Sequence, residues 1–164
     1  SLRAVEPVEV KALMPLLSPT MPFHLHISEQ LKEVAESKAY LGKRPVEWLT
    51  ENIALNENFH LVHATHLTHS EVTAIAKSKA NVVLCPSTEG NLGDGIFALK
   101  DFQKAGGNWS IGTDSHIGLN PFEELRILDY GQRLTTHQRN TFTDKDQEDS
   151  GLYALHKFIT NGRN

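Results

Sequence analysis

Short β-prone apolar segments alternate with helical patterns along this chain of 164 residues. Such an alternation predicts an α/β fold, in which parallel strands are joined by right-handed helical crossovers. Periodicity alone does not distinguish a doubly wound sheet from a (β/α)8 barrel. The expected strands are Leu2–Val5, Phe23–Ile27, His60–Ala64, Asn81–Cys85 and Trp109–Gly112.

Helical patterns lie between and after the expected strands. Thr68 is a predicted N-cap, because Glu71 follows three residues later at the spacing of a capping box. Asp144–Ser150 is expected to be a polar loop or helix start. The expected helices are Glu29–Tyr40, Pro45–Ile53, Ser70–Lys77, Phe97–Ala105, Phe122–Leu134 and Tyr153–Ile159.

Polar side chains follow several of these strands, and this favours the barrel. In a (β/α)8 barrel the carboxyl ends of all strands meet at one face, which carries the active site. A complete barrel needs roughly 250 residues, so we expect the C-terminal portion, about strands 4–8, in a fragment. Residues 1–140 would form the partial catalytic barrel and 141–164 a C-terminal helical extension. The polar residues in question are His26, Glu29, His63, His66, Cys85, Ser87–Glu89, Asp114 and His116.

The charge and cysteine content narrow the class of partner. The formal net charge is -4, which gives no electrostatic reason to expect binding to nucleic acid or to an anionic membrane. Cys85 is the single cysteine, so no internal disulfide forms and a cytoplasmic location is favoured. No apolar run has membrane-spanning length. A small-molecule substrate is therefore the expected partner.

The segment His24-Leu-His26-Ile-Ser-Glu29 could carry metal chemistry. On a strand, His24 and His26 share one face because side chains alternate. An imidazole can bind zinc, and a carboxylate three residues later can transfer protons. Histidine pairs of this spacing also occur as packed or exposed residues, so the spacing leaves both interpretations open.

Four other positions offer further candidate groups. Asp114 could bind a metal ion or serve in a turn, and His63 at a strand end could polarise a substrate C=N or C=O group. The guanidinium of Arg3 could bind a substrate carboxylate or form an ion pair with a neighbouring loop. Asn91–Gly95 could form a tight loop over a ligand.

Taken together, several motifs resemble the amidohydrolase superfamily and, within it, the formimidoylglutamate deiminase family. They are HLHISEQ, LVHATHLT, LCPSTEGNLGDGIF, and GTDSH followed by NPFEELRILDYGQRL. The resemblance extends from Ser1 to about Asn140. It implies that His26 is the metal ligand on the fifth strand and Glu29 the proton shuttle. It also implies that His63 activates water and polarises the substrate, that Asp114 is the last metal ligand and a second acid-base group, and that Arg3 binds the glutamate portion of the substrate.

The resemblance further implies hydrolysis of N-formimidoyl-L-glutamate to N-formyl-L-glutamate and ammonia in histidine degradation. One divalent metal ion, zinc, is the expected cofactor. Two of its ligands come from a first-strand HxH motif that is not in this sequence, so the fragment alone is expected to be inactive. We expect the parent enzyme to be a homo-oligomer. The alternatives are another aminohydrolase of the superfamily, of purine or triazine type, and a catalytically inert half-barrel that self-associates.

Overall fold

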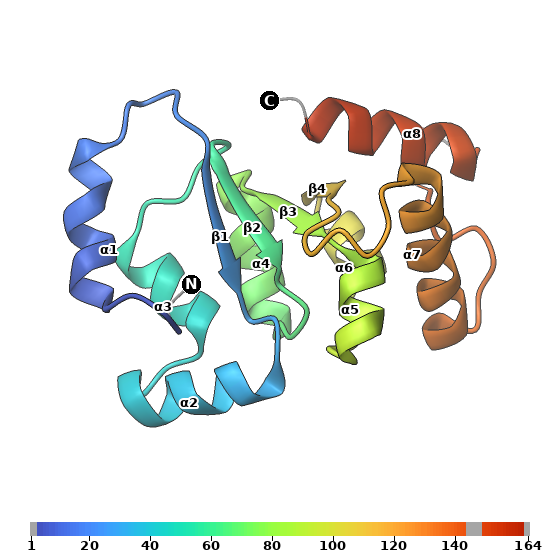
Figure 1. Ribbon diagram of the computed structural model, residues 1–164. Coiled ribbons are helices and arrows are strands. Elements are labelled where there is room, and N and C mark those ends of the chain that lie inside the picture. The colour runs from blue at the N-terminus through green and yellow to red at the C-terminus, as the bar shows by residue number, and fades with distance from the viewer. Residues whose placement is uncertain (1–2, 144–148, 163–164) are drawn as a thin grey trace.

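The computed structural model describes residues 3–143 and 149–162, and its centre is one parallel sheet (Figure 1). Four strands pair in the order β1-β2-β3-β4, and each neighbouring pair is parallel. A doubly wound sheet reverses its strand order at a switch point, whereas these four strands succeed one another in one direction. The order is that of a partial barrel, as predicted. The strands are β1 (Phe23–Ile27), β2 (Phe59–His63), β3 (Asn81–Leu84) and β4 (Asn108–Ile111).

Helices connect the strands and extend beyond both edges of the sheet. Figure 1 shows α1 and α2 on the β1 side and α7 and α8 on the β4 side. The six predicted helices are confirmed with shifted ends, whereas α1 and α5 were not predicted. The helices are α1 (Pro7–Leu13), the 3-10 segment η1 (Met14–Leu16), α2 (Leu31–Leu41), α3 (Pro45–Asn52), α4 (His69–Ser78), α5 (Pro86–Leu92), α6 (Leu99–Lys104), α7 (Pro121–Thr136) and α8 (Ser150–Asn161).

The two faces of the sheet differ in chemistry. One face buries apolar strand residues together with apolar helix residues, which include Leu49, Ile75 and Phe102. The opposite face carries His24 and His26, which line a common hollow, as the period-two argument predicted. Burial of the apolar face holds the sheet on its helices, and the polar face remains available for chemistry. The buried strand residues of the apolar face are Leu25, Ile27, Leu61, Val82, Leu84 and Trp109.

The predicted capping box at the start of α4 is present. The Glu71 backbone N–H donates to Thr68 Oγ1 at 3.3 Å, and the Thr68 backbone N–H donates to Glu71 Oε2 at 2.7 Å. The Arg44 guanidinium adds a contact to Glu71 at 2.9 Å. These bonds fix the loop that leaves β2, because they satisfy backbone donors that the first helical turn leaves open.

The expected strand Leu2–Val5 is wrong. Arg3–Val5 form a turn and a bend, and Leu2 lies outside the described residues. Pro7 begins α1, with a capping box between Glu6 and Glu9, so the chain turns into a helix at once. Sequence pattern alone did not reveal this, because β-prone residues precede the proline.

The polar segment before the last helix was predicted to be a loop or a helix start, and the structure describes only its end. Residues 144–148 of the expected polar segment Asp144–Ser150 lie outside the described residues. Asp149 caps α8 by accepting from the Leu152 backbone N–H at 3.0 Å. The described helices include none that is both long enough and apolar enough to cross a membrane.

Candidate active site

The carboxyl ends of β1 and β2 and the segment after β4 bring three candidate ligands together. His26 Nε2 lies 3.1 Å from Asp114 Oδ1, and the His26 and His63 rings have centroids 5.3 Å apart. One ligand atom from each of the three residues lies within 4.8 Å of the other two. The structure therefore groups His26, His63 and Asp114, three of the polar residues that were expected to meet at one face of the barrel.

Unusual backbone angles help to form this group. His63 has a φ of 69°, Ala64 of 49° and Asp114 of 44°, all in the left-handed region. Such angles cost a residue with a side chain on the order of 1–2 kcal/mol. Ile27 pairs with His63 in the strand register, yet the ring of His63 lies beside His26. Strand alternation would place the His63 side chain on the same face as Ile27. The left-handed backbone at His63 coincides with its ring lying on the face of His26 instead.

Glu29 lies next to the group, in the turn after β1. Its Oε1 is 3.7 Å from His63 Nε2, and its side chain is buried. Its other carboxylate oxygen, Oε2, pairs with the Arg3 guanidinium, whose Nε lies 4.0 Å from Glu33 Oε2. A carboxylate at this distance can exchange protons with a molecule held between it and His63.

His63 is fully buried, and a second carboxylate faces its other ring nitrogen. Glu89 Oε1 lies 3.2 Å from His63 Nδ1. Burial lowers the pKa of His63, but the Glu89 hydrogen bond and the nearby charges of Glu89, Glu29 and Asp114 outweigh it, so the pKa is raised overall. His63 Nε2 has no hydrogen-bond partner among the described residues.

The charged form of Asp114 is favoured by the neighbouring histidines. Partial burial raises the pKa of Asp114, but the His26 hydrogen bond, the charges on His63 and His26 and the Ser115 backbone N–H together lower it. An ionised carboxylate offers only acceptor lone pairs, as a metal ligand must. Asp114 is accordingly suited to binding a cation.

The three residues fit a divalent metal ion. Their donor atoms are imidazole nitrogens and a carboxylate oxygen, the set that zinc commonly takes in catalytic sites. The buried Nε2 of His63 lacks a hydrogen-bond partner among the described residues, as expected of a nitrogen whose partner is a group that these residues do not supply. His26 and Asp114 remain the predicted ligands.

A hollow of about 350 Å³ lies against this group on the polar face of the sheet, and His24, His26 and Asp114 help to line it. Cys85 also lines it, but burial and then the charge of Glu89 raise the pKa of the thiol, so the thiolate is disfavoured. Cys85 therefore suits packing better than metal binding or nucleophilic attack.

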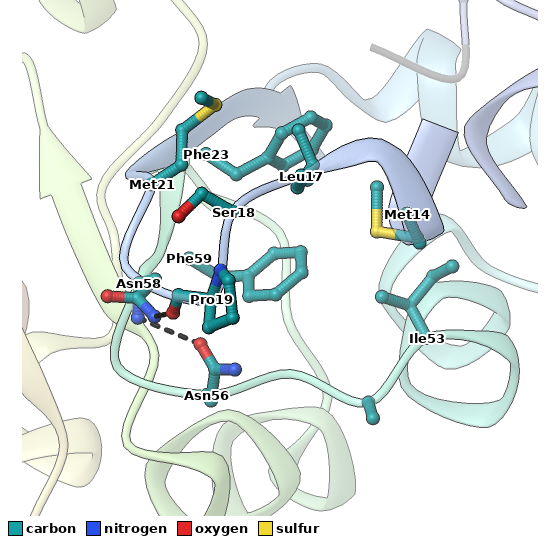
Figure 2. A pocket seen from close by; sticks show the side chains of 11 residues that line it. Met14, Leu17, Ser18, Pro19, Met21, Phe23, Ile53, Asn56, Asn58 and Phe59 are labelled. Atoms are coloured by element: carbon teal, nitrogen blue, oxygen red, sulfur yellow. Dashed lines mark hydrogen bonds between the residues drawn. The ribbon is translucent and has the colours of Figure 1, made fainter. Parts of the chain in front are cut away.

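Figure 2 shows a different hollow, of about 200 Å³, beside the amino ends of β1 and β2. Phe23 and Phe59 begin these two strands, and Met14 and Ile53 add apolar surface. Among the described residues, none with an acid or base side chain lines this hollow. The candidate metal ligands lie at the other end of the strands, where barrel enzymes carry their active sites.

The remaining sequence-based candidates have different outcomes. Arg3 lies at the edge of the site, paired with Glu29, and its predicted role in substrate binding stays a prediction. His66 is in the loop after β2, and His69 begins α4. Glu89 contacts His63 but was not among the predicted catalytic residues, because the short and mostly polar helix α5 gave no helical periodicity. One feature of the sequence could have indicated Glu89: it follows four residues after Cys85, which ends the expected strand.

Comparison with known proteins identifies relatives. The sequence model of the amidohydrolase family matches residues 9–148. The chain is 49% identical over 147 residues to formimidoylglutamate deiminase from Pseudomonas aeruginosa, a match that covers 90% of the chain and 32% of that protein. It is 34% identical over 108 residues to 5-methylthioadenosine/S-adenosylhomocysteine deaminase from Pyrococcus furiosus, which covers 66% of the chain and 26% of that protein. The chain thus spans about a third or less of the length of these relatives.

Solved structures give the same picture. An amidohydrolase from Brucella melitensis superposes with a TM-score of 0.92 at 40% identity and covers 97% of this chain and 35% of its own. An adenosine deaminase from Xanthomonas campestris, crystallised with bound zinc, superposes with a TM-score of 0.76 at 30% identity and covers 82% of this chain and 31% of its own. The similarity to a portion of each structure confirms the partial-barrel interpretation.

Proposed function

The chain belongs to the amidohydrolase family, and on that basis we propose that it forms part of an enzyme that hydrolyses N-formimidoyl-L-glutamate to N-formyl-L-glutamate and ammonia. The observation that carries the proposal is the grouping of His26, His63 and Asp114, with Glu29 3.7 Å from His63. The identity of 49% to a formimidoylglutamate deiminase supports the choice of substrate.

In this proposal His26 and Asp114 would hold one divalent ion, zinc, together with two ligands from an HxH motif outside this sequence. When bound there, zinc would supply a water molecule of lowered pKa and a positive charge beside the C=N bond of the substrate. This chain also contributes the acid-base groups that transfer the protons during hydrolysis.

Three side chains of this chain act on the protons. Glu29 takes a proton from the attacking water as its oxygen adds to the formimino carbon, and gives a proton to the leaving nitrogen. Asp114, the second acid-base group, takes the remaining proton of that water as the C=O bond forms, and this proton completes the ammonia. His63 contacts the water or the formimino group through Nε2. The bond from carbon to the terminal nitrogen breaks, ammonia leaves, and a formyl group remains on the glutamate nitrogen.

Arg3 is proposed to bind a carboxylate of the substrate. Its guanidinium pairs with the Glu29 carboxylate and lies near the Glu33 carboxylate. Arg3 is therefore at the border of the site and already binds carboxylate groups. A substrate carboxylate would exchange with one of these partners through the same planar donors.

The wider setting is likewise a proposal. We place the enzyme in the cytoplasm, in histidine degradation, as a homo-oligomer. Residues 1–140 would belong to the catalytic barrel and 141–164 to a helical extension of it. The contact of α8 with β4, where the Asn161 side-chain amide donates to the Trp109 carbonyl at 3.0 Å, supports an extension that packs on the barrel.

A purine-type aminohydrolase is the competing function, because a methylthioadenosine deaminase is among the relatives. The test compares ammonia release from N-formimidoyl-L-glutamate and from 5′-methylthioadenosine by the protein that carries this chain. We expect turnover of the first substrate only, and a rise in its KM in Arg3→Met. Turnover of 5′-methylthioadenosine alone, or an unchanged KM in Arg3→Met, would contradict the proposal.

A further inference from the structure

The first turn of α5 connects three parts of the active-site region through three consecutive side chains. Ser87 bonds to Glu124 of α7, Thr88 Oγ1 lies 2.9 Å from Ser115 Oγ, and Glu89 faces His63. Ser115 directly follows Asp114, and His63 ends β2. A single helical turn therefore contacts both His63 and the neighbour of Asp114, two of the three residues of the candidate metal group.

Glu124 holds this turn in place. Its buried carboxylate accepts from the Ser87 backbone N–H at 2.9 Å and from the Ser87 hydroxyl at 2.5 Å. The first backbone donors of a helix have no partner within the helix itself, so Glu124 supplies one from α7. This anchoring fixes the place of Glu89 two residues later.

The contacts of Glu89 determine which nitrogen of His63 carries the proton. Glu89 Oε1 accepts from the Cys85 backbone N–H at 2.9 Å and lies 3.2 Å from His63 Nδ1. A carboxylate oxygen that accepts from an amide donor is an acceptor toward the imidazole as well, so Nδ1 is the donor. The alternative partner is weaker, because Glu29 Oε1 is 3.7 Å from Nε2, beyond hydrogen-bond distance.

We propose that Glu89 is a positioning residue that fixes the Nδ1–H tautomer of His63 and leaves the Nε2 lone pair facing the reaction centre. The inference rests on the proposed function for its catalytic consequence. With its lone pair free, Nε2 accepts a hydrogen from the attacking water or from the formimino N–H. Partners of the second imidazole nitrogen commonly set the orientation and tautomer of histidines in metal sites.

The test uses the metal-free protein that carries this chain, labelled with [15N]histidine, and reads the two ring nitrogens of His63 by NMR. The signals of His63 are those that vanish in His63→Asn. Two variants separate the contributions of Glu89. Glu89→Gln keeps an oxygen acceptor, whereas Glu89→Met has similar length and no acceptor. Thr88→Val is the matched control, since it removes a hydrogen bond from the same turn without touching His63.

At a pH above the raised pKa of His63, where the ring is neutral, we expect a protonated, pyrrole-like Nδ1 and an unprotonated, pyridine-like Nε2 in the wild type, in Glu89→Gln and in Thr88→Val. In Glu89→Met we expect a mixture of tautomers and, with zinc bound, a kcat lower by about 10–100-fold at nearly unchanged KM. A proton on Nε2 in the wild type, or an unaltered tautomer in Glu89→Met, would overturn the inference. Absence of N-formimidoyl-L-glutamate turnover in the wild type would instead overturn the proposed function, because the tautomer is read without metal or substrate.

Discussion

His26 Nε2 lies 3.1 Å from Asp114 Oδ1, although 88 residues separate them and they belong to opposite edges of the described sheet. His26 is on β1, and Asp114 follows β4. With about 4.8 Å between neighbouring strands, three spacings in a flat sheet would set these edges about 14 Å apart. Residues 112–114, which follow β4, span part of this distance, and the contact is consistent with the closing of the sheet that a barrel requires.

The first prediction concerns metal affinity. Asp114→Asn replaces an ionised ligand by a neutral amide, so zinc binding should weaken. Partners outside the direct ligand shell typically change affinity by about 10–100-fold, and loss of a direct ligand should cost at least as much. Chelator competition on the protein that carries this chain measures the change. Asp101→Asn, at an exposed position on α6, is the control and should bind zinc as the wild type does.

The second prediction concerns the anchor of α5. The two carboxylate oxygens of Glu124 accept one hydrogen bond each from the Ser87 backbone N–H and the Ser87 hydroxyl. Glu124→Gln replaces one of these oxygens by an amide nitrogen, so one of the two Ser87 donors loses its acceptor. A buried donor without a partner costs about 1–3 kcal/mol of unfolding free energy. The adjacent Glu123 pairs with Arg126 at the surface, and Glu123→Gln should change stability by less than about 0.5 kcal/mol. Urea unfolding measures both values, and equal effects at the two positions would contradict the role of Glu124.

Several features of the fold and the site were predictable from sequence because they depend on local spacing. The capping box of Thr68 and Glu71 and the shared face of His24 and His26 follow from the geometry of a helix start and of a strand. The alternation of strands and helices predicted the parallel sheet. The grouping of His26, His63 and Asp114 followed once their strand ends were expected to meet at one face.

Other features depend on contacts between distant segments, which spacing does not reveal. The contact of Glu89 with His63 joins α5 to β2, and the left-handed φ of His63 turns a ring that strand alternation would place elsewhere. The expected strand Leu2–Val5 was wrong because β-prone residues were weighed without the helix that Pro7 begins. The sequence order of the strands left two sheet types open, and only their spatial order decided between them.

The third prediction concerns packing before β4. A Cβ at Gly107 would lie 2.4 Å from the Phe102 ring, whose side chain is fully buried. Gly107→Ala should therefore destabilise the fold by about 1–3 kcal/mol through overpacking. Gly90 in α5 has open space around its Cβ position, so Gly90→Ala should stabilise by about 0.4–1 kcal/mol. Thermal unfolding of the two variants should shift in opposite directions, and a shift of the same sign in both would contradict this account.

The fourth prediction concerns pH. Burial, and then the charge of His24, which stacks on His60 at 4.3 Å, lower the pKa of His60 in the folded state. In the unfolded state His60 therefore takes up its proton at a higher pH, near the ordinary histidine pKa of about 6.5. His60 contributes stability above this pH, and the contribution is lost as the pH falls toward the folded-state pKa.

The contribution of His60 to the free energy of unfolding should accordingly decrease on acidification below about pH 6.5. His60→Gln removes this contribution, whereas the opposite contribution of His63, whose pKa is raised, remains, so the variant should lose less stability than the wild type on acidification. His156→Gln, at an exposed position on α8, serves as the control and should keep the wild-type slope. Urea unfolding over a series of pH values measures the slope. An identical slope in His60→Gln and wild type would show that His60 does not contribute.

The most direct test of the central claim is the rate of ammonia release from N-formimidoyl-L-glutamate by Glu29→Gln. The claim assigns the proton transfers to Glu29, which lies beside His63. Because a positioned acid-base group contributes about 10²–10⁴-fold, kcat should fall by that factor while zinc stays bound. The matched variant Glu36→Gln, at an exposed position on α2, should keep the wild-type rate. A zinc-loaded Glu29→Gln protein that releases ammonia as fast as the wild type would contradict the account.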